Sequence, residues 1–243
     1  MLRITADTHT HTVHSHGTGT VEDNVRAAID RGLSCIAVSD HGMQHLCYNI
    51  KNMDDYLRDI DAVRKKYAGY IDVLTGIEMN LLSSDGDIDF PVKWAQYFDL
   101  RLMGYHKLVR YKTLSDKLHM LLFKTKGENA VTRNTAAYIH AMDRFKIDII
   151  THPNYGLPVD LIALAKHAAK KGVALEINAK HPEFTTNELV ACAKTGVKFS
   201  VGSDAHSPVR VGDFLPALKK AHAAGISAEQ ILYAENDVCP QDK

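Results

Sequence analysis

Short apolar runs alternate along the chain with amphipathic segments, and this alternation predicts strands that are each followed by a helix. The strands are expected at residues 2–7, 35–39, 71–77, 100–104, 147–151, 174–178 and 198–202. Residues 21–31 and 54–67 repeat apolar side chains at helical spacing. Seven strand–helix units predict a mixed α/β fold whose parallel sheet is closed, or nearly closed, into a barrel. In such barrels the active site lies where the strands end.

Capping residues place the ends of several helices. Thr20, with Asp23 three residues on, is expected to cap the first helix through an acidic variant of the capping box. Pro158 is placed to open a helix that ends at Gly172. Thr186 is expected to cap the helix after it. No linker or internal repeat interrupts this rhythm, so residues 1–243 are expected to form one domain.

Composition narrows the function classes. The 243 residues carry 29 basic and 29 acidic side chains, and this zero net charge gives no electrostatic reason to expect nucleic acid or an anionic membrane as a partner. No apolar run approaches the roughly 18 residues of a membrane-spanning helix, and no signal peptide is expected before the first strand. Four cysteines share no metal-ligand or redox spacing, which predicts free thiols in a reducing cytoplasm: Cys35, Cys47, Cys192 and Cys239. The sequence leaves the oligomeric state open.

Histidines and acids gather where the expected strands end. The set comprises His9, His11, His16, His41, Glu78, His106, His152, Asp204 and His206. His9 and His11 are two residues apart on an extended strand and so project to the same side, and Asp204 and His206 repeat this spacing after the last strand. Imidazole and carboxylate groups suit zinc, iron or manganese. Nine convergent ligands are too many for one ion, so the pattern predicts a polynuclear site.

Six separated motifs carry a resemblance to a known family. They read Asp7-Thr8-His9-Thr10-His11-Thr12, Ser39-Asp40-His41-Gly42, Gly76-Ile77-Glu78, Gly104-Tyr105-His106, Thr151-His152-Pro153 and Gly202-Ser203-Asp204-Ala205-His206. In this order they resemble the motifs of the polymerase and histidinol phosphatase (PHP) family, and most closely its stand-alone bacterial phosphatases. The resemblance implies a distorted (β/α)7 barrel similar to the TIM barrel, with three divalent ions (zinc, manganese and/or iron) at the carboxyl ends of the strands.

The same resemblance implies a distribution of ligands over the three ions. The first ion would be held by His9, His11, Glu78 and Asp204. Glu78 would also bridge to the second ion, whose other ligands would be His106 and His152. The third ion would fall to His16, His41 and His206. Many members of the family carry Ser-Asp-Gly where this chain has Ser15-His16-Gly17, so the position of His16 is usually Asp. His14 is therefore an alternative to His16 as the ligand. Asp7 and Asp40 are expected to orient neighbouring imidazoles.

A phosphate ester suits such a cluster of cations. Two ions that share a hydroxide lower the pKa of its parent water, and the hydroxide held by the Glu78-bridged pair would attack phosphorus. Glu78, Asp204 and His206 are therefore the expected catalytic residues. Cations and donors outside the metal shell are expected to bind the substrate, with Arg210 first and then Lys180, His181 and Lys107.

Several functions remain open at this point. The leading one is metal-dependent hydrolysis of a small phosphomonoester, such as histidinol phosphate, a sugar phosphate or a nucleotide. The alternatives are a phosphodiesterase or exonuclease, an amidohydrolase, and a metal-binding module without catalysis. Residues 107–128 depart from the strand–helix rhythm, and they are expected to form either a partly helical lid or a surface excursion with its own small core.

Overall fold

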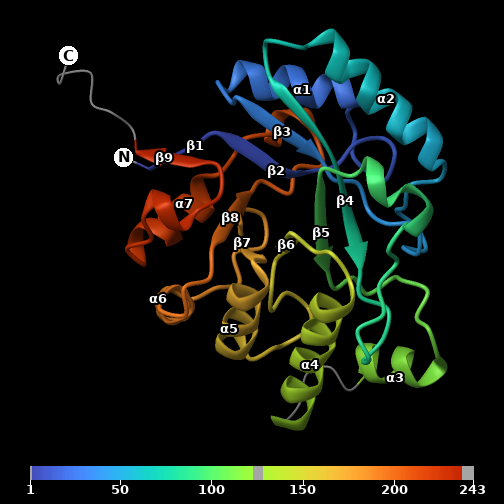
Figure 1. The fold of residues 1–243 in the computed structure, drawn as a ribbon, viewed down its shortest axis with the longest axis vertical. Coiled ribbons are helices and arrows are strands. Elements are labelled where there is room, and N and C mark those ends of the chain that lie inside the picture. Colours follow the sequence, from blue (N-terminus) through green and yellow to red (C-terminus); the bar gives the residue numbers. More distant parts are fainter. Residues whose placement is uncertain (1, 123–127, 237–243) are drawn as a thin grey trace.

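A seven-stranded parallel sheet forms the centre of the protein, shown here as a computed structural model that describes residues 2–122 and 128–236. Its strands are β2 (Ala6–Thr10), β3 (Cys35–Val38), β4 (Asp72–Asn80), β5 (Leu100–Gly104), β6 (Ile149–Ile150), β7 (Ala174–Asn178) and β8 (Phe199–Gly202). They are hydrogen-bonded to one another in chain order. The sheet curls until Thr10 and Ala205 form a single bridge between its two edges (Figure 1). The structure therefore confirms a nearly closed, distorted (β/α)7 barrel.

Helices cover the outside of this barrel, as Figure 1 shows. They are α1 (Val21–Asp30), α2 (Met53–Lys66), α3 (Leu114–Leu122), α4 (Glu128–Arg144), α5 (Leu161–Lys171), α6 (Thr186–Ala193) and α7 (Leu215–Ala223), with short 3-10 turns η1 (Val92–Tyr97), η2 (Pro208–Arg210) and η3 (Ala228–Gln230). Helix α3 occupies part of segment 107–128, of which residues 123–127 lie outside the described part of the chain. Within the described ranges, no helix has the length and apolarity needed to cross a bilayer.

The structure confirms some of the expected helix ends and corrects others. Thr20 and Asp23 form the expected capping box of α1. The helix expected to open at Pro158 begins at Leu161, because the carboxylate of Asp160 accepts the first free amide protons. The cap of α6 is Thr185 rather than its neighbour Thr186, since only Thr185 lies three residues before Glu188 and can form the reciprocal pair.

The expected first strand, residues 2–7, divides into two strands. Leu2–Ile4 (β1) pairs antiparallel with β9 (Ala234–Asn236) in a separate two-stranded sheet. The barrel strand β2 starts only at Ala6, and all five of its residues are buried. This shift places His9 inside the strand.

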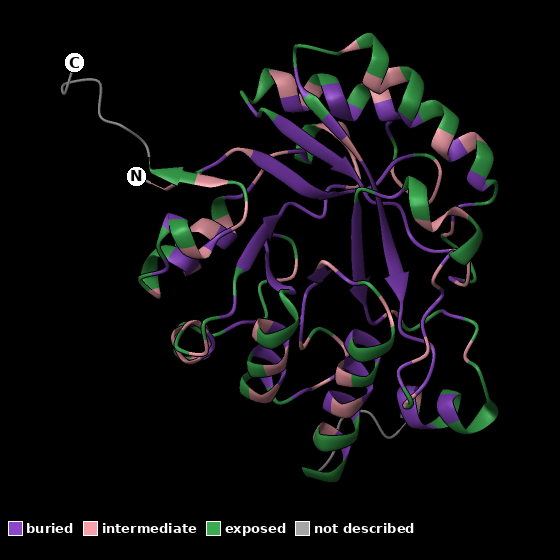
Figure 2. Cartoon of the chain, in the orientation of Figure 1, coloured by how far each residue is buried: buried purple, intermediate pink, exposed green. Residues whose placement is uncertain are grey.

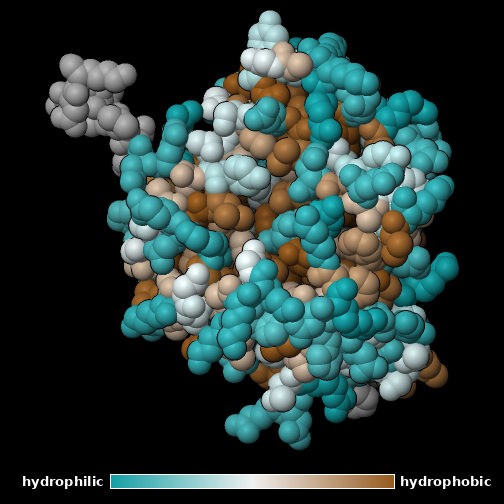
Figure 3. All heavy atoms as spheres, viewed as in Figure 1, coloured by the Kyte–Doolittle hydropathy of each residue, from teal (hydrophilic) through white to brown (hydrophobic). Residues whose placement is uncertain are grey.

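Apolar side chains fill the amino-terminal end of the barrel. A small buried cluster contains Ala37, Leu100, Leu102, Ile149 and Ala174, with Leu232 packed against it. A larger cluster lies between the sheet and the helices, so the strands are buried on both faces (Figure 2). The helices turn hydrophilic side chains outward, as the space-filling view shows (Figure 3). Because these apolar side chains occupy one end of the barrel, the buried polar groups lie at the other end.

Candidate metal centre

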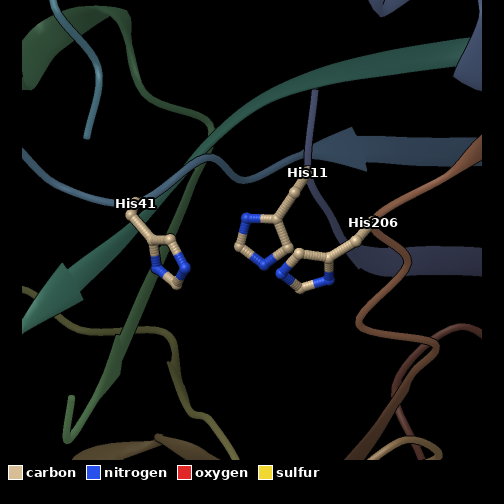
Figure 4. Close-up of side chains that lie close together, drawn as sticks. All are labelled: His11, His41 and His206. Atoms are coloured by element: carbon tan, nitrogen blue, oxygen red, sulfur yellow. The ribbon is translucent and has the colours of Figure 1, made fainter. Parts of the chain in front are cut away.

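The carboxyl ends of six strands bring the expected ligands together. Six of these residues are at most 5% exposed: His9, His11, His41, Glu78, His152 and Asp204. In Figure 4 the rings of His11, His41 and His206 point toward one another from three separate segments. His152 and Asp204 have positive φ angles of 29° and 52°. Strained backbone of this kind costs about 1–3 kcal/mol and clusters at functional sites.

The carboxylate of Glu78 lies at the centre of the group. Its Oε1 is 2.9 Å from Nε2 of His152 and 3.4 Å from Nε2 of His106. Its Oε2 is 2.8 Å from Nδ1 of His41 and 3.4 Å from Nε2 of His9. The two oxygens therefore face different sets of imidazoles, which is the arrangement of a carboxylate able to bridge two cations.

The donor atoms fit divalent metal ions. Three groups have donor atoms within 4.8 Å of one another: His9, His11 and Asp204; His11, His41 and His206; His41, Glu78 and His106. His41 Nδ1 and Glu78 Oε2 are close, yet neither atom makes a hydrogen bond. Buried polar atoms without partners are rare because they cost about 1–3 kcal/mol each. Cations in these positions would satisfy them.

The electrostatic environment keeps most of these groups in the form that binds metal. Burial lowers the pKa of His11 to about 3, and the neighbouring His206 and His9 add to the effect. Burial opposes ionisation of Glu78 and Asp204, but the surrounding imidazoles hold the pKa of both carboxyls well below their usual values. Neutral imidazoles and ionised carboxylates are the ligand forms of zinc, iron and manganese.

The pKa of His9 is shifted in the opposite direction to that of His11. Burial alone would lower its pKa, but the carboxylates of Glu176, Glu78 and Asp204 raise it well above the usual value. Three carboxylates therefore lie close enough to this ring to favour a positive charge on it, which is also the environment that a bound cation would need.

Two orienting residues escaped the sequence analysis. Glu176 in β7 is fully buried, and its Oε1 lies 2.8 Å from Nδ1 of His9 while its Oε2 accepts a hydrogen bond from the amide of His152. Asn80 at the end of β4 holds Nδ1 of His106 at 2.8 Å. A charged residue in the middle of an otherwise apolar buried strand was the available signal for Glu176.

The orienting roles expected for Asp7 and Asp40 are wrong. Asp7 accepts hydrogen bonds from the backbone amides of His9, Ser203 and Gly212. Asp40 accepts from the amide and hydroxyl of Thr12 and from the hydroxyl of Ser15. Both carboxylates therefore fix the backbone that carries the candidate ligands, and not the imidazole rings.

The structure separates His16 from its rival. The ring of His16 stacks on His41 at 4.9 Å and lies 4.1 Å from that of His206, so it borders the cavity. His14 instead turns to α2, where its Nε2 is 3.1 Å from the carboxylate of Asp59. This arrangement supports His16 as the ligand candidate.

A cavity of about 170 Å³ opens above the candidate ligands. Lys180 and His181 line it, and Nζ of Lys180 lies 3.3 Å from Asp204 Oδ1 and 2.9 Å from His206 Nδ1. Arg210 is not among the lining residues, since its guanidinium pairs with Asp213 at 2.6 Å. Lys107 does not line this cavity either, but lines a neighbouring hollow.

The fold and the donor cluster define a barrel of the metal-dependent hydrolase type, and comparison with known proteins gives the family. The PHP domain matches residues 7–224, so the chain belongs to the PHP family. A probable phosphatase of Aeromonas hydrophila is 31% identical over 246 residues, covering 95% of this chain and 90% of the relative. Another, from Shewanella sp. (strain W3-18-1), is 34% identical over 246 residues, covering 95% and 88%.

A solved structure supports the same fold. The histidinol phosphate phosphatase of Lactococcus lactis, crystallised with zinc, L-histidinol and phosphate, superposes with a TM-score of 0.68. The two chains are 21% identical, and the match covers 91% of this chain and 92% of the other. Together these comparisons confirm the expected family and barrel, and they support assignment of the chain to the phosphatase class of hydrolases.

Proposed function

We propose that this protein hydrolyses a small phosphomonoester at a centre of three divalent cations. The main support for this proposal is the central position of Glu78, because its two oxygens face two different sets of imidazoles. The relatives named as phosphatases support the reaction class. When bound, the cations would activate water and neutralise the charge of the phosphate group.

The protein's own residues would bind and orient the ester. Lys180, held between Asp204 and His206, presents a positive charge at the cavity and would attract a phosphate oxygen. His45 accepts hydrogen bonds at Nδ1 from the amides of Cys47 and Tyr48, which leaves the proton on Nε2. That nitrogen can donate to an oxygen of the substrate. Glu78 and Asp204 would remain ionised and hold the cations in place.

The size of the cavity favours a monoester over a diester. A volume of about 170 Å³ accommodates a phosphoryl group but little more, whereas small-molecule sites commonly measure about 300–1,000 Å³. A second ester arm on phosphorus would have to enter the same confined space.

The test uses protein reconstituted separately with Zn²⁺, Mn²⁺ and Fe²⁺, assayed on p-nitrophenyl phosphate, bis(p-nitrophenyl) phosphate and p-nitroacetanilide. We expect preferred turnover of the monoester, loss of turnover on chelation, and background activity in Glu78→Gln. The exposed-surface variant Glu183→Gln serves as the matched control and should behave as wild type. Preference for the bis-ester would indicate a phosphodiesterase, and preference for the anilide an amidohydrolase. No turnover with any metal would indicate a binding module.

A further inference from the structure

A second hollow adjoins the metal cavity and is lined by different chemistry. We call it the outer chamber; it measures about 250 Å³ and is lined by His45, Tyr48, Tyr105, His106, Lys107, Leu108, Tyr155 and Gly156. Four of these residues also line the metal cavity, so the two spaces lie side by side and share walls: His45, Tyr48, His106 and Tyr155. Neither space alone reaches the lower end of the usual small-molecule range, whereas together they do.

Aromatic rings form the walls of the outer chamber. Tyr155 stacks on His181 with ring centroids 3.9 Å apart, and Tyr48 stacks on His16 at 4.4 Å. Each tyrosine is thus fixed by an imidazole of the metal cavity while remaining more than one-third exposed. Stacked π-faces of this kind favour a planar, aromatic guest over a flexible polar one.

The chamber is held in shape by its backbone. The loops that follow β3 and β5 pair through two hydrogen bonds, from Leu46 to the carbonyl of Leu108 at 2.7 Å and from Arg110 to that of Gln44 at 2.8 Å. Tyr111 adds a hydrogen bond from its hydroxyl to the carbonyl of Lys107. The walls are therefore preformed, which lowers the entropic cost of binding.

The only charged side chain among the described residues that line the outer chamber, apart from its histidines, is the cation Lys107. Lys107 is exposed, and among the described residues no carboxylate lies within ion-pair distance of its ammonium. The described residues that line the chamber include no aspartate or glutamate. A cationic leaving group would find no counter-charge there, whereas an anionic one would find Lys107.

We propose that the outer chamber binds the leaving group of the substrate, and that this group is a planar aromatic ring bearing a negative charge, such as a carboxylate. The inference rests on the proposed function, because it assumes that phosphate occupies the metal cavity. It assigns Lys107 the recognition of charge and Tyr48 and Tyr155 the recognition of the ring.

Three phenyl phosphates test the charge preference, with a para carboxylate, a para carboxamide or a para aminomethyl group. We expect kcat/KM to fall in that order for the wild type. Lys107→Gln should lower kcat/KM about two- to fivefold for the carboxylate ester alone, as expected for an exposed charge pair. Lys107→Glu should favour the aminomethyl ester. Lys117→Gln, which removes an exposed lysine outside the chamber, is the matched control.

The ring preference and the binding step are tested separately. Tyr155→Leu should raise KM for the aryl esters and leave that for glycerol phosphate unchanged. Calorimetric titration with 4-carboxybenzylphosphonate should show weaker binding to Lys107→Gln than to wild type and Lys117→Gln. If all esters are cleaved but the charge series is flat, or Lys107→Gln changes all three equally, the outer chamber has another role and the phosphatase function stands. If no ester is cleaved under any metal, the proposed function itself fails.

Discussion

Oε1 of Glu176 lies 2.8 Å from Nδ1 of His9. Its other oxygen accepts a hydrogen bond from the amide of His152 at 2.8 Å. One buried carboxylate in β7 therefore positions two candidate ligands, one on β2 and one after β6. Because the acid fixes Nδ1 of His9, it turns Nε2 toward Glu78 and His11.

Replacement of Glu176 by Gln is expected to weaken metal binding. An amide cannot reproduce the charged acceptor that orients His9, and loss of such a partner costs about 10- to 100-fold in affinity. The measurement is metal retained after dialysis against graded chelator, read by mass spectrometry. The surface variant Glu183→Gln should retain metal as the wild type does. Wild-type retention in Glu176→Gln would show that the residue serves the fold alone.

Asn80 gives a second prediction, on the opposite side of Glu78. Its Oδ1 holds Nδ1 of His106, and its Nδ2 donates to Asp89 at 2.7 Å. Asn80→Ala should lower the free energy of unfolding by about 1–3 kcal/mol, because buried groups lose their partners. It should also lower kcat, since the ring of His106 is no longer fixed. Urea unfolding and steady-state kinetics measure the two effects, and Asn129→Ala on the exposed face of α4 should change neither.

Gly104 is predicted to tolerate no side chain. An added methyl group would press against Oγ1 of Thr151 and lie 2.8 Å from the ring of His152. Both groups hydrogen-bond Oε1 of Glu78. Gly104→Ala should therefore reduce kcat and metal content more than its loss of stability explains. Gly172→Ala is the control, since φ is 71° there and no atom lies within 4 Å, so it should lose stability and keep activity.

Asp87 gives a prediction for the dependence of stability on pH. Burial opposes its ionisation, but hydrogen bonds from Arg144, Ser83 and Lys112 lower its pKa to about 2. The folded pKa is below the usual 3.8, so this stabilisation is nearly complete above about pH 5 and is lost as the pH falls toward 2. Asp87→Asn should lower the unfolding free energy by at most about 2 kcal/mol at pH 7, and by less at pH 3. Urea unfolding at both values measures this, with exposed Asp85→Asn as the control; an equal difference at both would contradict it.

The position of most strands could be predicted because parallel strands covered on both faces read as apolar runs. Strand β2 was the exception. Its sequence, Ala6–Thr10, is mostly polar and includes His9 of the donor cluster, whereas the more apolar Leu2–Ile4 lies outside the barrel. Local pattern alone does not distinguish a polar strand inside a barrel from a loop.

The candidate ligands could be predicted because strand ends converge on one face of a barrel. Their partners could not, since a hydrogen bond such as that between Glu176 and His9 depends on rotamers and on the spacing of strands far apart in the sequence. The same reason explains why Arg210 lies outside the cavity although the sequence predicted it there. Its distance from His206 along the chain suggested the cavity, but the turn at η2 directs its guanidinium to Asp213.

In the described part of the chain, one bridge joins the edges of the sheet, between Thr10 and Ala205. His9 and His11 lie on one side of this seam and Asp204 on the other, and all three offer donor atoms to one group. An ion bound there would link the two edge strands of the sheet and so hold the barrel closed. A ligand whose free concentration is 100 times its Kd stabilises the folded state by about 2.7 kcal/mol. The supply of metal in the cell would then govern how long the protein persists as well as how fast it works.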